Sequence, residues 1–191
     1  MIQLTHGIAK MALKPTIYKM NINRSDLNND VYDSLNLTVA QHPSETLERM
    51  MARVVALCLY SQEEFITFTK GLSNVEEPDI WAKSLADEFL LWIDMGEPSF
   101  ERIKKASRLA KTVGIYTFNT KSDVWWQQAE NDFRTLKNLS VYQFQFEQIQ
   151  ALAKLVKRTM ELSITITGES TYIATELGEC EVNHTVLQQS Q

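Results

Sequence analysis

The stretch LLWIDMGEPSFERIKKA, residues 90–106, combines an apolar strand, a sharp break and a basic helix. An extended run that is apolar on both sides is typical of a strand covered on both faces of a sheet. One acid, Asp94, lies near the end of this run, a Gly-Glu-Pro sequence then breaks it, and Lys104 and Lys105 follow in a helical pattern over 99–111. The stretch allows two interpretations. Either Asp94 caps the strand end beside a solvated helix, or it forms one wall of a metal site.

Outward from this stretch, strands and helices alternate. The spacing of apolar residues predicts strands over 64–71, 89–95, 113–119 and 139–146, and helices over 99–111, 122–137 and 147–158. Residues 73–81 (SNVEEPDIW) are expected to form a loop. This order predicts an α/β fold in which a mixed sheet is flanked by helices.

Both ends of the chain add further strands. Residues 13–23 and 31–41 partly alternate around a turn-rich RSDLNND sequence, which predicts an N-terminal antiparallel hairpin. A helix is expected from Ser44, a plausible N-cap, to about Tyr60. Three strands are expected at the C-terminus, over 160–168, 170–177 and 179–186. No linker interrupts the pattern, so residues 11–191 are expected to form a single domain.

The composition excludes several classes of protein. Of the 191 residues, 44% are hydrophobic and 23% charged, which is enough for one ordinary core. The net charge of −5 argues against a protein that simply coats nucleic acid, because such proteins neutralise phosphates with basic residues. The two distant cysteines form no CxxC pair, and the N-terminus has no signal-peptide pattern, so a reducing cytoplasm is expected. No apolar run is long enough to predict a membrane span.

The motifs of several catalytic mechanisms are missing. Neither the GxGxxG nor the GxxxxGK[ST] phosphate loop occurs, and there is no GxSxG nucleophile turn. The three histidines are far apart and form no HExxH pattern. The remaining chemistry must come from carboxylates and lysines.

Three acids are candidates for such chemistry. On a helical wheel, Glu48 lies in line with the apolar residues of its helix, whereas Arg49 and Arg53 lie opposite. A buried carboxylate needs a cation, a metal or hydrogen-bond donors. Asp79 follows a proline in the acidic sequence EEPDIW, and Asp94 lies on the covered strand. Each acid also has a structural alternative. Glu48 would lie at a helix edge and pair with an arginine, Asp79 would belong to an acidic surface turn, and Asp94 would cap the end of its strand.

The helix at 99–111 carries a basic face. Lys104, Lys105, Arg108 and Lys111 fall within one arc, opposite its apolar residues. A solvated face is the ordinary explanation. If this face lies beside the acids, the carboxylates would bind Mg²⁺, which prefers oxygen ligands, and a lysine would stabilise charge that develops on a phosphoryl group.

Several motifs together resemble the YaeQ family of bacterial proteins. They are MALKPTIYK (11–19), HPSETLERMMARV (42–54), EEPDIW (76–81), LWIDMGEP (91–98), ERIKKA (101–106), WWQQ (125–128) and NLSVY (138–142). The resemblance covers nearly the whole chain from Met11 onward. Residues 1–10 lie outside the pattern, as an N-terminal extension to which no function is assigned.

The resemblance implies a variant of the restriction-endonuclease-like fold of the PD-(D/E)XK nuclease superfamily. That fold has helix–strand–strand–strand–helix–strand order. The resemblance makes Glu48 the helix acid, Asp79 the first acid of the motif and Asp94 the second. The motif then requires a lysine where this chain has Gly96. Some members of the superfamily carry the lysine on the following helix, which would nominate Lys104 or Lys105, and Glu101 is a further candidate for a displaced acid.

Two functions follow as hypotheses. The first is an Mg²⁺-dependent nuclease or other phosphodiesterase acting on nucleic acid, with Glu48, Asp79 and Asp94 as metal ligands and Lys104 or Lys105 as the catalytic lysine. The second is a nuclease-like scaffold without catalysis that binds protein or nucleic acid. It predicts an acid cluster satisfied by internal hydrogen bonds. The net charge and Gly96 favour the second hypothesis, whereas the clustered acids and lysines favour the first.

Overall fold

The computed structural model describes residues 14–191, which form ten strands, four α-helices and one short 3-10 turn. The strands are β1 (Thr16–Asp26), β2 (Val31–Gln41), β3 (Ile66–Phe68), β4 (Ile80–Lys83), β5 (Phe89–Met95), β6 (Ala110–Thr117), β7 (Leu139–Phe144), β8 (Thr159–Thr167), β9 (Ser170–Thr175) and β10 (Gly178–Gln188). The helices are α1 (Leu47–Cys58), α2 (Phe100–Leu109), α3 (Ser122–Phe133) and α4 (Phe146–Ala153).

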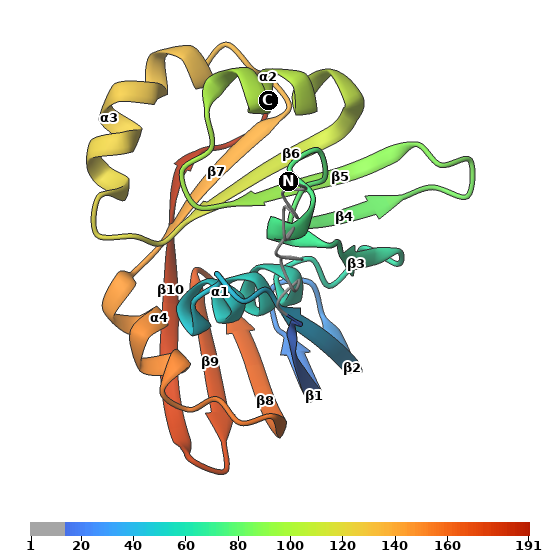
Figure 1. Cartoon of the computed structure of the whole chain (residues 1–191), viewed down its shortest axis with the longest axis vertical. Coiled ribbons are helices and arrows are strands. Elements are labelled where there is room, and N and C mark those ends of the chain that lie inside the picture. Colours follow the sequence, from blue (N-terminus) through green and yellow to red (C-terminus); the bar gives the residue numbers. More distant parts are fainter. Residues whose placement is uncertain (1–13) are drawn as a thin grey trace, which may run out of the picture.

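All ten strands join in one mixed sheet, in the order β2-β1-β8-β9-β10-β7-β6-β5-β4-β3. The expected hairpin is confirmed, because β1 and β2 pair antiparallel from Thr16↔Gln41 to Asp26↔Val31. Parallel pairs join β5, β6 and β7, and another joins β1 and β8. The long strand β10 connects the two halves of the sheet: its first part pairs with β9 and its last part with β7 (Figure 1).

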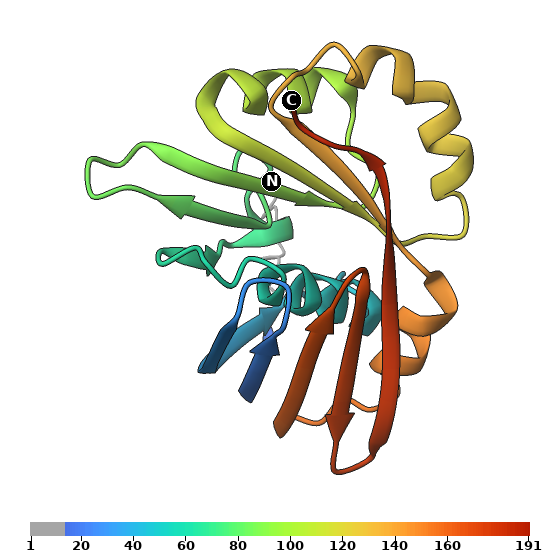
Figure 2. The same ribbon diagram turned by 180° about the vertical axis from the view of Figure 1, so that it is seen from behind.

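The sheet curls around α1 instead of lying flat between two layers of helices. Every residue of Met50–Cys58 in α1 is buried, and these side chains share one core with the inner faces of β1, β8 and β5. Figures 1 and 2 show α1 inside the curve, with α2 and α3 outside it. A second core lies between α2, α3 and strands β5 to β7. The expected mixed sheet is therefore present, but one of its helices is enclosed rather than flanking.

Two local expectations were wrong. Residues 80 and 81 were expected to end a loop but begin β4, which pairs antiparallel with both β3 and β5. The N-cap of α1 is Thr46 and not Ser44: the Thr46 side chain accepts a hydrogen bond from the backbone N–H of Arg49. Ser99 caps α2 in the same way, through the backbone N–H of Arg102.

The buried thiol of Cys58 gives a first testable prediction. Its side chain is fully buried on α1, and burial raises the pKa of Cys58 to about 12. The half-buried Cys180 also has its pKa raised by burial. Because the thiolate is the reactive form, we expect iodoacetamide to modify Cys180 slowly in the native protein and Cys58 only after unfolding. Mass spectrometry of the labelled peptides measures this, and rapid native labelling of Cys58 would contradict its burial.

Candidate functional site

A cavity of about 230 Å³ lies beside the start of β4, the end of β5 and the first turn of α2. Two of the predicted site acids, Asp79 and Asp94, line it. Two arginines, Arg49 from α1 and Arg102 from α2, line it as well. The fold thus brings together two acids that are fifteen positions apart in the sequence, and it places a cation beside each of them.

Asp79 uses both carboxylate oxygens within the protein. Its Oδ1 accepts a hydrogen bond from Nη2 of Arg49 at 2.6 Å, and its Oδ2 accepts one from the backbone N–H of Met95 at 2.8 Å. The residue is only 5% exposed. Its backbone N–H also donates to the carbonyl of Ile93 at 2.9 Å. Asp79 therefore ties the start of β4 to β5 and to α1, which excludes the alternative of an acidic turn on the surface.

Asp94 forms a two-point ion pair with Arg102. Nε of Arg102 donates to Oδ2 at 2.6 Å, and Nη2 donates to Oδ1 at 2.9 Å. Asp94 is 2% exposed. Burial raises the pKa of Asp94 above its usual value, although the hydrogen bonds and charge of Arg102 act in the opposite direction. The negative charge of Asp79 also raises the pKa of Asp94, which is consistent with the two acids being neighbours.

Arg102 also fixes the loop beside the cavity. Its Nη1 donates to the carbonyl of Val75, and its Nη2 donates to the carbonyl of Glu77 at 2.8 Å. One guanidinium thus joins the strand acid Asp94, helix α2 and the loop that leads to Asp79. This explains why a basic helix follows the strand so closely in the sequence: its first turn carries the partner of Asp94.

A second ion-pair network lies on α1. The Glu45 carboxylate accepts hydrogen bonds from Nη1 of Arg49 at 2.8 Å, and from Nε and Nη2 of Arg53 at 2.8 and 2.7 Å. The Arg53 and Glu45 side chains are 3% and 2% exposed. Arg49 and Arg53 were expected on the side of the helix opposite the core, and for Arg53 this is wrong. Because the sheet curls around α1, the polar side of this helix also faces protein.

Glu48 does not join either network. It is half-buried in the first turn of α1, and within residues 14–191 its side chain takes part in no ion pair or hydrogen bond. It is not among the residues that line the cavity. The structural alternative for this position, a helix-edge Glu paired with an arginine, is realised instead by Glu45.

The lysines of α2 point elsewhere. Neither Lys104 nor Lys105 lines the cavity. Nζ of Lys105 lies 2.6 Å from Oε2 of Glu76, and Nζ of Lys104 lies 4.0 Å from Oε1 of Glu101. Nζ of Lys104 is also 5.4 Å from the centre of the Phe100 ring. These lysines form surface contacts with nearby acids rather than approaching Asp94.

Gly96 stands where the nuclease motif requires a lysine. Its φ of +90° is in the left-handed region that side chains disfavour, although no atom within 4 Å would meet a Cβ there. Its backbone N–H donates to the carbonyl of Tyr116 at 2.9 Å, which continues the pairing of β5 with β6. Glycine therefore serves the backbone conformation that ends β5.

Gly96→Lys is a direct test of this position. We expect the substitution to lower the free energy of unfolding by about 1–2 kcal/mol, because the left-handed backbone would be strained. We also expect it to confer no Mg²⁺-dependent cleavage of labelled DNA or RNA. Urea unfolding and a gel-based cleavage assay measure the two effects. Cleavage gained by the variant would show that only the motif lysine is missing.

The residues of the cavity do not fit the Mg²⁺ site that the sequence suggested. Both oxygens of Asp79 and of Asp94 already accept hydrogen bonds, three of these four oxygens from arginine. A cation would have to displace or lie beside two guanidinium groups, which repel it. Within residues 14–191, no group of three or more His, Cys, Asp or Glu residues is arranged to hold a metal.

The main residues missed from sequence are the two arginines and Glu97, which also lines the cavity. Two signals pointed to the arginines. Arg102 lies in the first turn of a helix, where a cation is unfavourable unless an acid pairs with it. Arg49 lies four positions after Glu45, on the same helix face. Glu97 accepts hydrogen bonds from Thr117, Ser122 and Asn119, and no local pattern predicts such distant partners.

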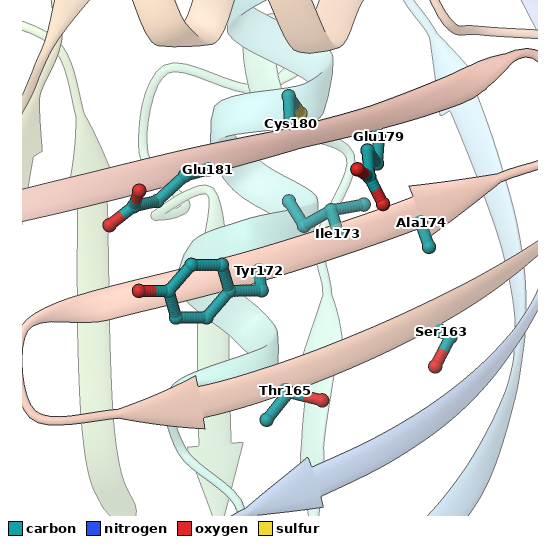
Figure 3. A pocket seen from close by; sticks show the side chains of 8 residues that line it. All are labelled: Ser163, Thr165, Tyr172, Ile173, Ala174, Glu179, Cys180 and Glu181. Carbon is teal, nitrogen blue, oxygen red and sulfur yellow. The ribbon is translucent and has the colours of Figure 1, made fainter.

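A second cavity, of about 380 Å³, lies on the other half of the sheet (Figure 3). It crosses β8, β9 and β10, on the face turned away from α1. Hydroxyl groups of Ser163, Thr165 and Tyr172 line it together with Glu179 and Glu181. None of the site residues predicted from sequence lies there. No cation is among its lining residues, so we do not assign chemistry to it.

Comparisons with known proteins agree with the sequence motifs. A family model described as "YaeQ protein" matches residues 11–184. The chain is 39% identical to "Uncharacterized protein YaeQ" of Escherichia coli K12 over 180 residues, which cover 94% of this chain and 99% of that protein. It is 38% identical to the Salmonella typhi protein of the same name, with the same coverage.

Solved structures extend the likeness to the fold. The YaeQ protein of Xanthomonas axonopodis pv. citri superimposes with a TM-score of 0.88 at 30% identity, covering 91% of this chain and 98% of that one. The YaeQ protein of Pseudomonas syringae gives 0.86 at 32% identity, covering 92% and 97%. On the family match, the sequence identities and the shared fold, the chain belongs to the YaeQ family.

Proposed function

We propose that the chain is a protein-binding module with a scaffold of the PD-(D/E)XK nuclease type, and that arginines occupy the place of the catalytic metal. The order of elements supports this scaffold. The run α1, β3, β4, β5, α2, β6 follows the helix–strand–strand–strand–helix–strand order of the superfamily. Asp79 directly precedes β4 and Asp94 lies in β5, so the two acids named by the resemblance lie at adjacent strands, which supports the proposal.

The observation that carries the proposal is the pairing of the acids with arginines. Arg49 binds Asp79 and Arg102 binds Asp94, so each carboxylate has a permanent positive charge beside it. An arginine keeps its proton even when it is buried, whereas burial readily shifts the pKa of a lysine. The cluster therefore has its counter-ions built in. This is the arrangement expected of a scaffold whose acids stabilise the fold, and not of acids that wait for a divalent cation.

A protein partner is favoured over nucleic acid by the surface around the cavity. The lysines of this region are largely compensated: Lys105 of α2 pairs with Glu76, and Nζ of Lys111, at the start of β6, lies 3.7 Å from Glu88. Arg108, on the same basic face, is exposed and forms no ion pair within residues 14–191, so this face offers phosphates one uncompensated charge and little more. Instead, the loop at the cavity carries two exposed apolar side chains, Leu72 at 41% and Val75 at 75%. Both side chains line the cavity, and adjacent exposed apolar groups rimmed by charged residues are typical of protein interaction sites.

The proposal places this binding in the cytoplasm. Both cysteines of the described residues are free thiols, as expected in a reducing compartment. Among the helices in residues 14–191, none has the length and apolar character needed to cross a bilayer.

Two experiments test the proposal, one on nucleic-acid chemistry and one on protein binding. Labelled single- and double-stranded DNA and RNA are incubated with wild type and Asp94→Asn, with Mg²⁺ or Mn²⁺ present. We expect no cleavage and only weak, salt-sensitive binding. In parallel, cross-linking in the native bacterium is expected to give one defined protein conjugate. Metal-dependent cleavage by wild type that is lost in Asp94→Asn would overturn the proposal in favour of a nuclease.

A further inference from the structure

The two edges of the ten-stranded sheet approach each other without pairing. Strands β2 and β3 stand at opposite ends of the strand order, and Figures 1 and 2 show them on neighbouring edges of the curled sheet. Both line one groove of about 250 Å³. Leu37, Thr38 and Ala40 of β2 lie on one side of it, and residues 66–69 lie on the other. We call this the edge groove. It is the place where the curled sheet stays open.

Successive residues of the two strands that line the edge groove alternate between an apolar side, which faces α1, and a polar side, which faces solvent. Leu57 and Arg53 of α1 lie at the floor of the groove. Nη2 of Arg53 donates to the carbonyl of Ala40 at 3.4 Å, and its guanidinium lies 5.2 Å from the centre of the Phe68 ring. Leu37 and Phe68 are partly buried and pack against the main core on the inner side. Thr38 and Thr67 are exposed on the outer side. A segment that continued this surface would need apolar side chains toward α1 and polar side chains toward solvent.

Strand β2 also lacks the features that usually protect an edge. It runs for eleven residues, VYDSLNLTVAQ, and pairs with β1 without a bulge. It contains no proline and no lysine, the residues that commonly blunt an edge strand. Apart from the carbonyl of Ala40, which accepts from Arg53, this long and regular edge presents backbone N–H and C=O groups to any strand that can reach it.

The geometry restricts what can fill the groove. A group that pairs with β2 and β3 together must offer backbone donors and acceptors on both of its sides. A strand in the sheet of a second copy of this chain has at most one free edge, so it cannot do this. Only a single extended segment has both edges free. The four positions 66–69 correspond to about 13 Å of extended chain.

We propose that an extended segment of a partner protein, alternating apolar and polar residues, adds as a strand between β2 and β3 and closes the sheet around α1. This inference rests on the protein-binding function proposed above and specifies its surface. The main-chain hydrogen bonds would supply affinity, and Leu37, Leu57 and Phe68 would select apolar side chains at every second position of the segment.

The test uses a synthetic probe with two matched controls. The probe is a fluorescein-labelled peptide of about nine residues that alternates valine and threonine, with a lysine at each end for solubility. Each control is the same peptide N-methylated at alternate residues, so that one control lacks the N–H groups of one edge and the other lacks those of the opposite edge. Fluorescence anisotropy with the full chain measures binding, and hydrogen exchange locates it.

We expect the unmethylated peptide to bind and each methylated peptide to bind about tenfold more weakly or worse, since both edges take part. Bound peptide should slow amide exchange in β2 and β3 and leave β9 unchanged. Three results would overturn the proposal: no binding, loss of binding with only one of the methylated peptides, or binding that appears only when residues 1–10 are deleted. The last would make the chain's own N-terminal segment the occupant. Metal-dependent cleavage in the earlier test would instead overturn the proposed function and leave the peptide result standing.

Discussion

Replacing Arg53 with methionine is expected to lower the free energy of unfolding by about 3–5 kcal/mol. Arg53 and Glu45 are both almost fully buried and make two hydrogen bonds to each other. Without Arg53, the Glu45 carboxylate keeps only Arg49 as a charged partner inside the protein. A buried charge that loses a partner carries most of its desolvation cost uncompensated. Urea unfolding of wild type and variant measures the difference.

Two further variants make this result specific to the buried pair. Arg134→Met removes an arginine from an exposed ion pair with Glu130, and we expect it to change stability by less than about 0.5 kcal/mol. Combining Arg53→Met with Glu45→Gln removes both charges, and we expect it to recover part of the loss. If Arg53→Met lowers the free energy of unfolding no more than Arg134→Met does, the ion pairs of Arg53 do not stabilise the packing of α1 against the sheet.

Replacing Arg102 with methionine is expected to cost about 2–3 kcal/mol near neutral pH, less than a fully buried pair because Arg102 is partly exposed. The loss should depend on pH. Burial raises the pKa of Asp94 above its ordinary value of 3.8, and removal of Arg102 raises this pKa further. The ionised carboxylate is then the costly form, so the variant is least stable relative to wild type above the folded pKa of Asp94. The difference shrinks as the pH falls toward 3.8 and the carboxyl takes up a proton.

Unfolding experiments near pH 8 and pH 4.5 on wild type and Arg102→Met measure this difference. Arg108→Met is the matched control, because Arg108 is an exposed arginine on the same helix and forms no ion pair within residues 14–191. We expect the control to match wild type at both pH values. A cost of Arg102→Met that stays constant between the two would mean that Asp94 does not depend on Arg102 for its charge.

Alternation and helical spacing were sufficient to predict most of the elements. The hairpin β1–β2, the covered strand β5, helix α2 and the three C-terminal strands all follow local patterns that tertiary contacts do not override. β4 was missed because four residues are too few to show a period, and the proline and acids before it indicate a loop.

The curl of the sheet could not be predicted from local patterns. It arises because β10 pairs with β9 over its first half and with β7 over its second, which joins strands far apart in the chain. This long-range pairing encloses α1, and it is the reason that Arg53 is buried on what a helical wheel marks as the exposed side. The helical wheel predicted correctly which residues form the polar side of α1. It predicted wrongly that this side faces solvent.

At the candidate site, the sequence identified the acids better than their partners. Asp94 was expected to need a compensating group because it lies on a strand covered on both faces, and it has one in Arg102. The resemblance instead predicted that Lys104 or Lys105 would reach Asp94, because the nuclease motif contains a lysine. Which cation of the helix reaches the acid depends on the entry angle of α2, and residue spacing does not determine that angle.

The most direct test of the arginine-filled site is a calorimetric titration of Mn²⁺ and Mg²⁺ into the wild-type protein and into Asp94→Asn. Our account predicts no binding by either protein at about 1 mM metal, because Arg49 and Arg102 already neutralise Asp79 and Asp94. Stoichiometric binding by wild type that disappears in Asp94→Asn would contradict it, and would place a metal on this acid.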